Sequence, residues 1–370
     1  MKSKENIQEL LDYLQTTEEK PVNFNYEAIV EACQKNNETR SLAIKILSVF
    51  GGILASLAFI GFLLLAGLYE SETGLLFFGI IFIAGAVWIS RILDEKIILD
   101  TIIVSFFAIG FLLLGLAFVT MEMNENMVCY LFIVMAFLSI VMAQSYLLSF
   151  ISTLIISGSL LSIIFLNHSY YFIHLYIAAW VVIITYVFLH EAKIITTNKV
   201  LSKVYNPVRT GLVLSLLAGL VFVGKKGLLS TLTESDDFIP ANYEWISSGV
   251  TIFAVIYLLF KLFEILNINN RKHKITICMF TILALLPTVF SPAIPGAVLL
   301  LLLSFYVNYK TGLVLGIIAF IYFISQYYYD LNLTLLTKSG LLFSSGVLFI
   351  GFYLVTRKKL MITKQDPQRF

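Results

Sequence analysis

Apolar residues follow one another in long runs from about residue 43 onward, with short polar links between the runs. A helix that crosses the hydrocarbon core of a bilayer needs about 20 mainly apolar residues. No run alternates steadily between apolar and polar positions, and unpaired strand edges cannot face lipid, so the pattern predicts helices. We expect about 12 transmembrane helices, near residues 44–68, 74–90, 97–119, 127–143, 145–165, 172–190, 208–224, 245–267, 274–290, 293–309, 311–329 and 339–356.

Three places leave the helix count open at about 11 to 13, because each interrupts an apolar run without clearly ending it. They are the link at Gln144, residues 225–233 and the proline-rich corner near 287–295. Two alternatives stand for the corner: an outer turn, which the X-Pro steps favour, or a broken helix of the kind that coordinates ions in transporters.

The two ends of the chain are polar. Within residues 1–42, Ile7, Leu10, Leu11 and Leu14 share one helix face, and a second apolar face follows Pro21. This pattern predicts a cytoplasmic amphipathic helical hairpin at 1–42, a transmembrane helical bundle at 43–356 and a basic cytoplasmic tail at 357–370.

Composition agrees with a membrane protein. Hydrophobic residues make up 59% of the chain, charged residues only 13%, and the mean hydropathy is +0.90. A soluble fold of 370 residues could not bury that much apolar surface, so the expected partner of the chain is the lipid bilayer. The net charge of +2 gives no reason to expect a nucleic-acid partner, and three scattered cysteines argue against a disulfide framework.

Lysines and arginines predict the orientation. If the N-terminus is cytoplasmic and the span count is even, most of the 25 lysines and arginines fall in the inner links and the tail. Cytoplasmic loops carry such an excess, so we predict an all-α polytopic protein with both termini inside.

Few ionisable residues lie within the predicted spans, and those that do are candidates for a functional site because charge is expensive in lipid. The candidate intramembrane polar site consists of Asp100, Lys261 and Glu264. Lys261 and Glu264 share a helix face at a spacing of three residues and could pair. Alternatively, Asp100 pairs with Lys261 across a cavity, or Lys261 simply reaches the membrane surface.

A five-residue echo connects two predicted helix starts. Residues 210–214 and 311–315 both read Thr-Gly-Leu-Val-Leu, and each copy follows a basic residue. The echo indicates either a repeated helical unit, as in many transporters, or a chance match in a leucine-rich chain.

Motifs for chemistry are missing from the sequence. It contains no nucleotide-binding loop, zinc motif or catalytic-triad pattern. We therefore expect no enzyme activity, no catalytic residue, no metal site and no cofactor. His168 and His174 are predicted on the outer side, where no ligand set is apparent.

The stretch from Tyr327 to Gly340, YYYDLNLTLLTKSG, resembles a signature of a bacterial multi-spanning family catalogued as a domain of unknown function. This is the DUF4401-like group, whose members are neighbours of small membrane proteins with a GDYXXLXY motif. The resemblance implies a multi-spanning fold in the bacterial cytoplasmic (inner) membrane and a neighbouring membrane protein as partner, but no activity. A candidate outer-face motif follows from it: Tyr327, Tyr328, Tyr329, Asp330 and Lys338.

Two functional classes remain. A secondary transporter or permease-like protein for a small or lipid-linked solute is favoured by the number of spans, the echo and the proline-rich corner. A non-transporting scaffold or sensor that works with a partner membrane protein is favoured by the shortage of buried charge.

Overall fold

The structure is a computed structural model that describes residues 42–65, 67, 71–92, 97–143, 145–224, 243–265, 270–289 and 291–330, with five further residues between 336 and 350. Residues 1–41 of the predicted hairpin, most of the last predicted span and the basic tail lie outside the described residues. The predictions for these segments therefore stay predictions.

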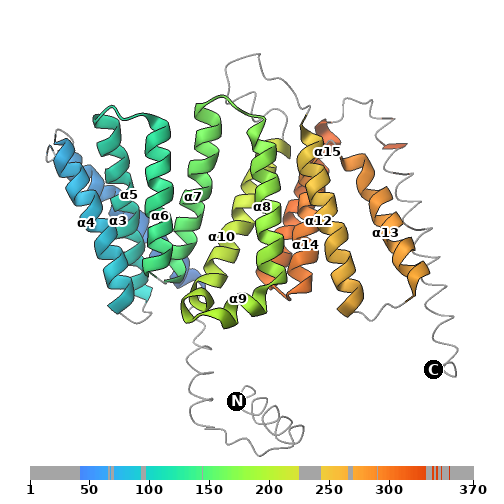
Figure 1. Ribbon diagram of the computed structural model, residues 1–370. Helices are drawn as coiled ribbons and strands as arrows, with labels where there is room; N and C mark the ends of the chain where they lie inside the picture. Colours follow the sequence, from blue (N-terminus) through green and yellow to red (C-terminus); the bar gives the residue numbers. More distant parts are fainter. Residues whose placement is uncertain are drawn as a thin grey trace, which may run out of the picture. The chain divides into compact units, whose positions relative to one another are not determined.

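Every element that the structure describes is a helix, so the all-α class is confirmed for these residues (Figure 1). The elements are α3 (Leu42–Leu65), α4 (Glu72–Ile92), α5 (Ile97–Thr120), α6 (Glu125–Ala143), α7 (Tyr146–Leu166), α8 (Phe172–Leu189), α9 (Glu191–Thr197), α10 (Lys199–Gly224), α12 (Glu244–Ile265), α13 (Arg271–Leu285), the 3-10 helix η2 (Leu286–Thr288), α14 (Ala293–Tyr306) and α15 (Lys310–Asp330).

Among the described residues, eight helices are long and apolar enough to cross a membrane: α4, α5, α6, α7, α8, α10, α12 and α15. A stretch of α3 and the whole of α14 form shorter apolar helices. The chain is therefore a multi-spanning helical membrane protein. The count of about 12 spans and the cytoplasmic placement of both termini remain predictions.

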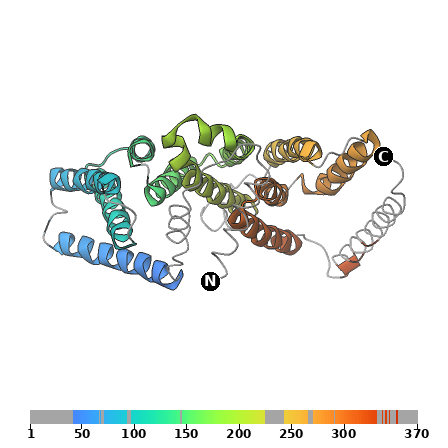
Figure 2. The same ribbon diagram turned by 90° about the horizontal axis from the view of Figure 1, so that it is seen from below.

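The chain divides into two compact units, residues 1–122 and residues 123–370. In unit 1, α5 lies between α3 and α4 (Figure 2). The α4–α5 contact is close because two glycines oppose each other: a Cβ on Gly110 would lie 2.9 Å from the carbonyl oxygen of Gly79. Small residues at such positions let transmembrane helices approach one another.

Unit 2 has a continuous apolar core. Leu, Ile and Val side chains of α8, α10, α12 and α14 fill it, and the innermost of them are fully buried, among them Ile177, Leu216, Leu258 and Leu300. Helix α13 packs on α12 and η2 and stands at the edge of the unit in Figure 2.

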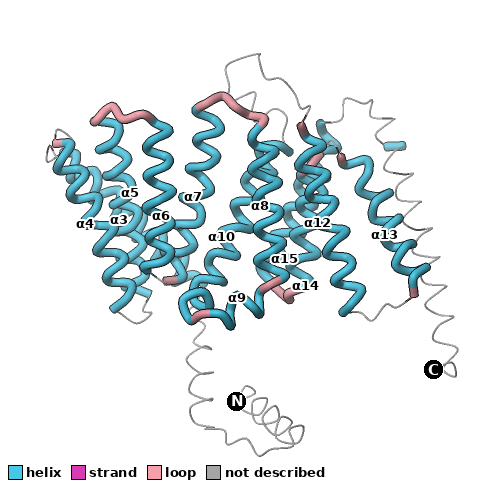
Figure 3. The backbone as a smooth tube through the Cα atoms, in the orientation of Figure 1, coloured by secondary structure: helices cyan, strands magenta, loops and turns pink. Residues whose placement is uncertain are grey.

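Consecutive long helices of unit 2 run in alternating directions, so its loops gather at two ends (Figure 3). The described lysines and arginines of this unit lie on one side, at or near helix ends except for Arg209, which is the eleventh residue of α10: Lys193, Lys199, Lys203, Arg209, Lys261, Arg271, Lys272, Lys274 and Lys310. The fold thus brings together the basic segments that the orientation rule assigns to one face of the membrane.

The start of α10 differs from the predicted span. The apolar pattern begins near residue 208, whereas the helix begins at Lys199 and continues through Pro207. Its first turns carry Lys199, Lys203 and Asn206, so hydropathy alone excludes them from the span. A proline inside a helix removes one backbone hydrogen bond, which is better tolerated near a membrane boundary than in the hydrocarbon core.

The proline-rich corner is a turn. Helix α13 ends at Leu285, η2 covers Leu286–Thr288, and α14 begins one residue after Pro292. Of the two alternatives drawn from the sequence, the described residues agree with the turn.

Candidate functional site

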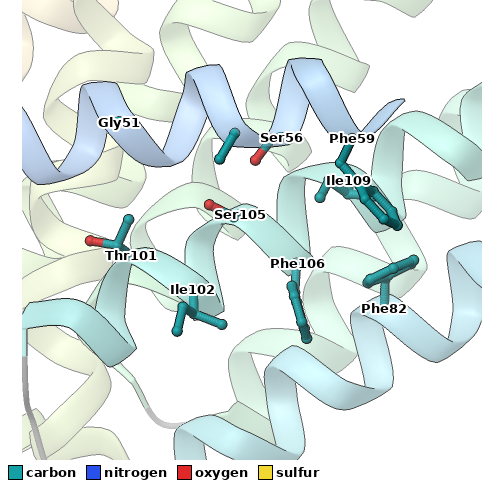
Figure 4. Close-up of a pocket in the computed structure, with 10 residues that line it drawn as sticks. Gly51, Ser56, Phe59, Phe82, Thr101, Ile102, Ser105, Phe106 and Ile109 are labelled. Carbon is teal, nitrogen blue, oxygen red and sulfur yellow. The ribbon is translucent and has the colours of Figure 1, made fainter. Parts of the chain in front are cut away.

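A cleft between α3 and α5 in the described part of unit 1 is large enough to bind a ligand. It has a volume of about 630 Å³, within the range of about 300–1,000 Å³ found for small-molecule sites. Ten residues from α3, α4 and α5 line it (Figure 4): Gly51, Ala55, Ser56, Phe59, Phe82, Thr101, Ile102, Ser105, Phe106 and Ile109.

The lining side chains recur every three or four residues on α3 and on α5, so each helix presents one face to the cleft. The two helices run in the same direction, because Gly51 lies near Thr101 at one end and Phe59 lies near Ile109 at the other (Figure 4). Along the length of the cleft, α3 therefore forms one wall and α5 forms the opposite wall.

Hydroxyl groups and aromatic rings occupy different parts of the cleft. Ser56 of α3 and Ser105 of α5 face each other across it (Figure 4). Farther along, Phe82 makes edge-to-face contacts with Phe59 and Phe106, with ring centroids 5.6 and 5.2 Å apart. The cleft thus offers aromatic surface for an apolar chain and hydroxyls for a polar group at its other end.

Asp100 lies beside the cleft, not in its wall. It directly precedes Thr101 in the first turn of α5, where the helix dipole favours a carboxylate. Lys261 and Glu264 pair with each other on α12, with 3.2 Å between Nζ and Oε2. Asp100 belongs to unit 1 and Lys261 to unit 2, so their pairing stays a prediction.

The outer-face motif is described in part. Tyr327, Tyr328 and Tyr329 form the last turn of α15, and Asp330 is the final residue of that helix. Tyr329 is 73% exposed, as an interfacial anchor would be. Lys338 lies outside the described residues, so the structure leaves the motif as a whole untested.

The sequence did not predict a cluster around Arg209, which counted there toward the orientation and as the basic residue before the first copy of the echo. Its guanidinium donates to Glu191 Oε1 at 3.0 Å and to Asn206 Oδ1 at 2.9 Å. It also stacks 4.0 Å from the centre of the Tyr309 ring, and its side chain is only 11% exposed. The cluster joins α9, α10 and the α14–α15 turn.

The five-residue echo is the feature of the sequence that could have indicated this cluster. The two copies start on neighbouring segments: Thr210 Oγ1 lies 2.9 Å from the hydroxyl of Tyr309, which directly precedes the second basic residue, Lys310. The ion pair itself joins residues 18 positions apart on different helices, and no local spacing rule predicts it.

Two buried polar contacts were also missed. The Tyr176 hydroxyl accepts from Trp180 Nε1 at 2.6 Å and donates to the carbonyl of Ser215 at 3.1 Å. His174 Nδ1 lies 3.0 Å from Ser247 Oγ, where both residues are buried between α8 and α12. These contacts satisfy polar groups inside the apolar core and fix which helix faces meet.

No group of three or more His, Cys, Asp or Glu side chains gathers around a possible metal position among the residues that the structure describes. The arrangement that these residues do form can bind an amphiphile in unit 1 and can lock helix ends together in unit 2.

Comparison with known proteins gives one match. A family model described as "Domain of unknown function (DUF4401)" matches residues 41–359. No curated protein and no solved structure matches the chain.

Proposed function

Because the chain belongs to the family described as a domain of unknown function (DUF4401), its membership supplies no activity, and we propose a function from the geometry. The protein is a permease-like membrane protein that binds an amphiphilic, lipid-linked solute in the α3–α5 cleft. The resemblance to this family drawn from Tyr327–Gly340 is confirmed by the match.

The observation that carries the proposal is the composition of the cleft wall. Seven of its residues are glycine or apolar, and three carry hydroxyls: Ser56, Thr101 and Ser105. A small, fully polar solute would find too few partners there, whereas a solute with an apolar chain and a polar end matches both parts of the wall. The helices that form the cleft are apolar enough to lie in lipid, so an apolar chain can enter from the bilayer.

Blocking the cleft tests this function. In Ser105→Phe the added ring would fill the space between α3 and α5, and we expect photo-crosslinking by a diazirine-bearing polyprenyl phosphate to fall at least tenfold. The measurement is the yield of crosslinked α3 and α5 peptides from the full-length protein in nanodiscs. Transfer of a fluorescent polyprenyl phosphate across proteoliposomes should fall with it.

Leu112→Phe is the matched control, because Leu112 lies two turns beyond Ser105 on the same helix, is half exposed and is not among the residues that line the cleft. It should crosslink like the natural protein. Equal labelling of Ser105→Phe and Leu112→Phe would contradict the cleft as the site, and labelling without transfer would leave a binding protein that is not a permease.

Orientation forms part of the same proposal: both termini are cytoplasmic, in the inner membrane of a bacterium. In a background without the natural cysteines, Asn124→Cys should react with an impermeant maleimide in intact cells and Lys272→Cys should react only after the cells are opened. Both positions are exposed, and they precede or begin helices at opposite ends of unit 2. The reverse labelling would invert the orientation.

The second candidate, a scaffold or sensor for a partner membrane protein, is favoured by a different observation. The described core of unit 2 consists mainly of apolar side chains, and the ion pairs described in the unit, Arg209–Glu191 and Lys261–Glu264, both lie on its basic side. Among the described residues of this unit, only two ion pairs are found, which leaves little charge with which to move a solute. If the polyprenyl phosphate neither crosslinks nor transfers, this candidate replaces the permease.

A further inference from the structure

The segment that connects α8 to α10 forms an elbow at one end of unit 2. We define the elbow as residues 190–206, which comprise His190, α9, Asn198 and the first turns of α10. Helices α8 and α10 are both candidate spans, and α9 lies across their lower ends in Figure 1. The elbow therefore lies where the hydrocarbon core meets the headgroups.

Three lysines of the elbow are exposed. Lys193 belongs to α9, and Lys199 and Lys203 lie one turn apart on the same face of α10. None of the three has a carboxylate within ion-pair distance among the described residues. Their charges are therefore available to a partner.

The apolar side of the elbow faces the protein and the membrane boundary. Ile194, Ile195 and Val200 are half-buried, whereas Leu201 is exposed. A segment with lysines on one side and aliphatic residues on the other is typical of a helix that lies in the membrane interface.

The single acidic residue of the elbow, Glu191, already forms an ion pair. Glu191 accepts from Arg209 at 3.0 Å, and Arg209 is held in turn by Asn206 and the Tyr309 ring. The Arg209 contact thus engages the one carboxylate of the elbow, and it fixes α9 against α10.

We propose that the elbow is a binding surface for the headgroups of anionic phospholipids. Charge complementarity carries the inference: three exposed ammonium groups without an ion-pair partner among the described residues lie at the end of two candidate spans, and the elbow's acidic side chain is paired with Arg209. Clusters of basic residues next to membrane spans attract anionic lipid in this way. The proposal is independent of the α3–α5 cleft, because it concerns other residues in the other unit.

The test compares two sets of three substitutions in the full-length protein. The elbow variant is Lys193→Gln, Lys199→Gln and Lys203→Gln, and the matched control is Arg271→Gln, Lys272→Gln and Lys274→Gln at the start of α13. Each removes three positive charges from the same end of unit 2. The probe is phosphatidylglycerol titrated into protein in neutral detergent, with bound lipid counted by native mass spectrometry.

We expect the elbow variant to bind phosphatidylglycerol at least tenfold more weakly, and the control to change less than threefold. Lys→Arg at the three elbow positions should restore binding, which excludes misfolding as the cause. Soluble glycerol 3-phosphate at equal concentration should not compete, because the surface recognises a headgroup within a membrane. Unchanged binding in the elbow variant, equal loss in both variants, or competition by the free phosphate would each overturn the proposal.

Discussion

Replacing Arg209 by alanine is expected to lower the free energy of unfolding of the protein by about 2–3 kcal/mol. The change removes the hydrogen bonds to Glu191 and Asn206 and the stacking on Tyr309, and it leaves the Glu191 carboxylate without its partner. Loss of one member of a fully buried ion pair costs about 3–5 kcal/mol. We expect a smaller loss of about 2–3 kcal/mol here, because the Glu191 side chain is 29% exposed and water can reach it. Reversible unfolding of the purified protein in mixed micelles, followed by circular dichroism, measures this effect.

Two further variants separate charge from geometry at this position. Arg209→Lys keeps the charge but loses the planar fork that contacts Glu191 and Asn206 together, so it should recover less than half of the lost stability. Lys203→Ala removes an exposed cation from the same helix and should change stability by less than about 0.5 kcal/mol. If Arg209→Ala unfolded like Lys203→Ala, the cluster would have no role in holding the helix ends.

The hydropathy pattern predicted where α4 and α5 lie in the sequence, but it did not predict which helices pack against each other. The apolar runs near 74–90 and 97–119 correspond to α4 and α5 within a few residues. Their pairing depends on Gly79 and Gly110, which look like ordinary small residues within a span. In lipid every face of such a helix is apolar, so the period of the pattern does not show which face meets a neighbour.

The candidate site shows the same limit. A search for charge within the spans selects Asp100, Lys261 and Glu264, because ionisable groups are rare in lipid. The cleft is instead lined by aromatic, aliphatic and hydroxyl side chains such as Phe82 and Ser105, which are common in any transmembrane helix. Only the arrangement of α3 beside α5 distinguishes them.

Residue spacing predicted an ion pair within one helix, but it could not predict an ion pair between two helices. Three residues separate Lys261 from Glu264, which predicts a shared face, and the structure shows their ion pair. Arg209 and Glu191 form the less exposed pair, yet they belong to different helices. Sequence reasoning therefore found the pair that matters less for stability.

The second large effect is expected at the contact between α4 and α5. Gly110→Ala should destabilise unit 1 by about 1–3 kcal/mol, the usual result of overpacking. The new methyl group would lie 2.5 Å from Ile83 Cγ1 and 2.9 Å from the carbonyl oxygen of Gly79. A side chain can rotate away, but a backbone carbonyl moves only with its helix, so α4 has to shift. Unfolding in mixed micelles measures the loss.

Gly85→Ala is the matched control, because it adds the same methyl group to α4 with only a Phe106 ring atom near it, at 4.0 Å. There the higher helix propensity of alanine should leave stability unchanged or raise it by up to about 1 kcal/mol. In the double variant Gly110→Ala with Ile83→Ala, the Ile83 contact disappears while the carbonyl contact remains, so no full recovery is expected.

A shift of α4 would also carry Phe82 away from Phe106 and open the aromatic end of the cleft. Gly110→Ala should therefore reduce crosslinking of the polyprenyl phosphate, while Gly85→Ala should not; stability and crosslinking equal to those of Gly85→Ala would contradict this account of the α4–α5 contact.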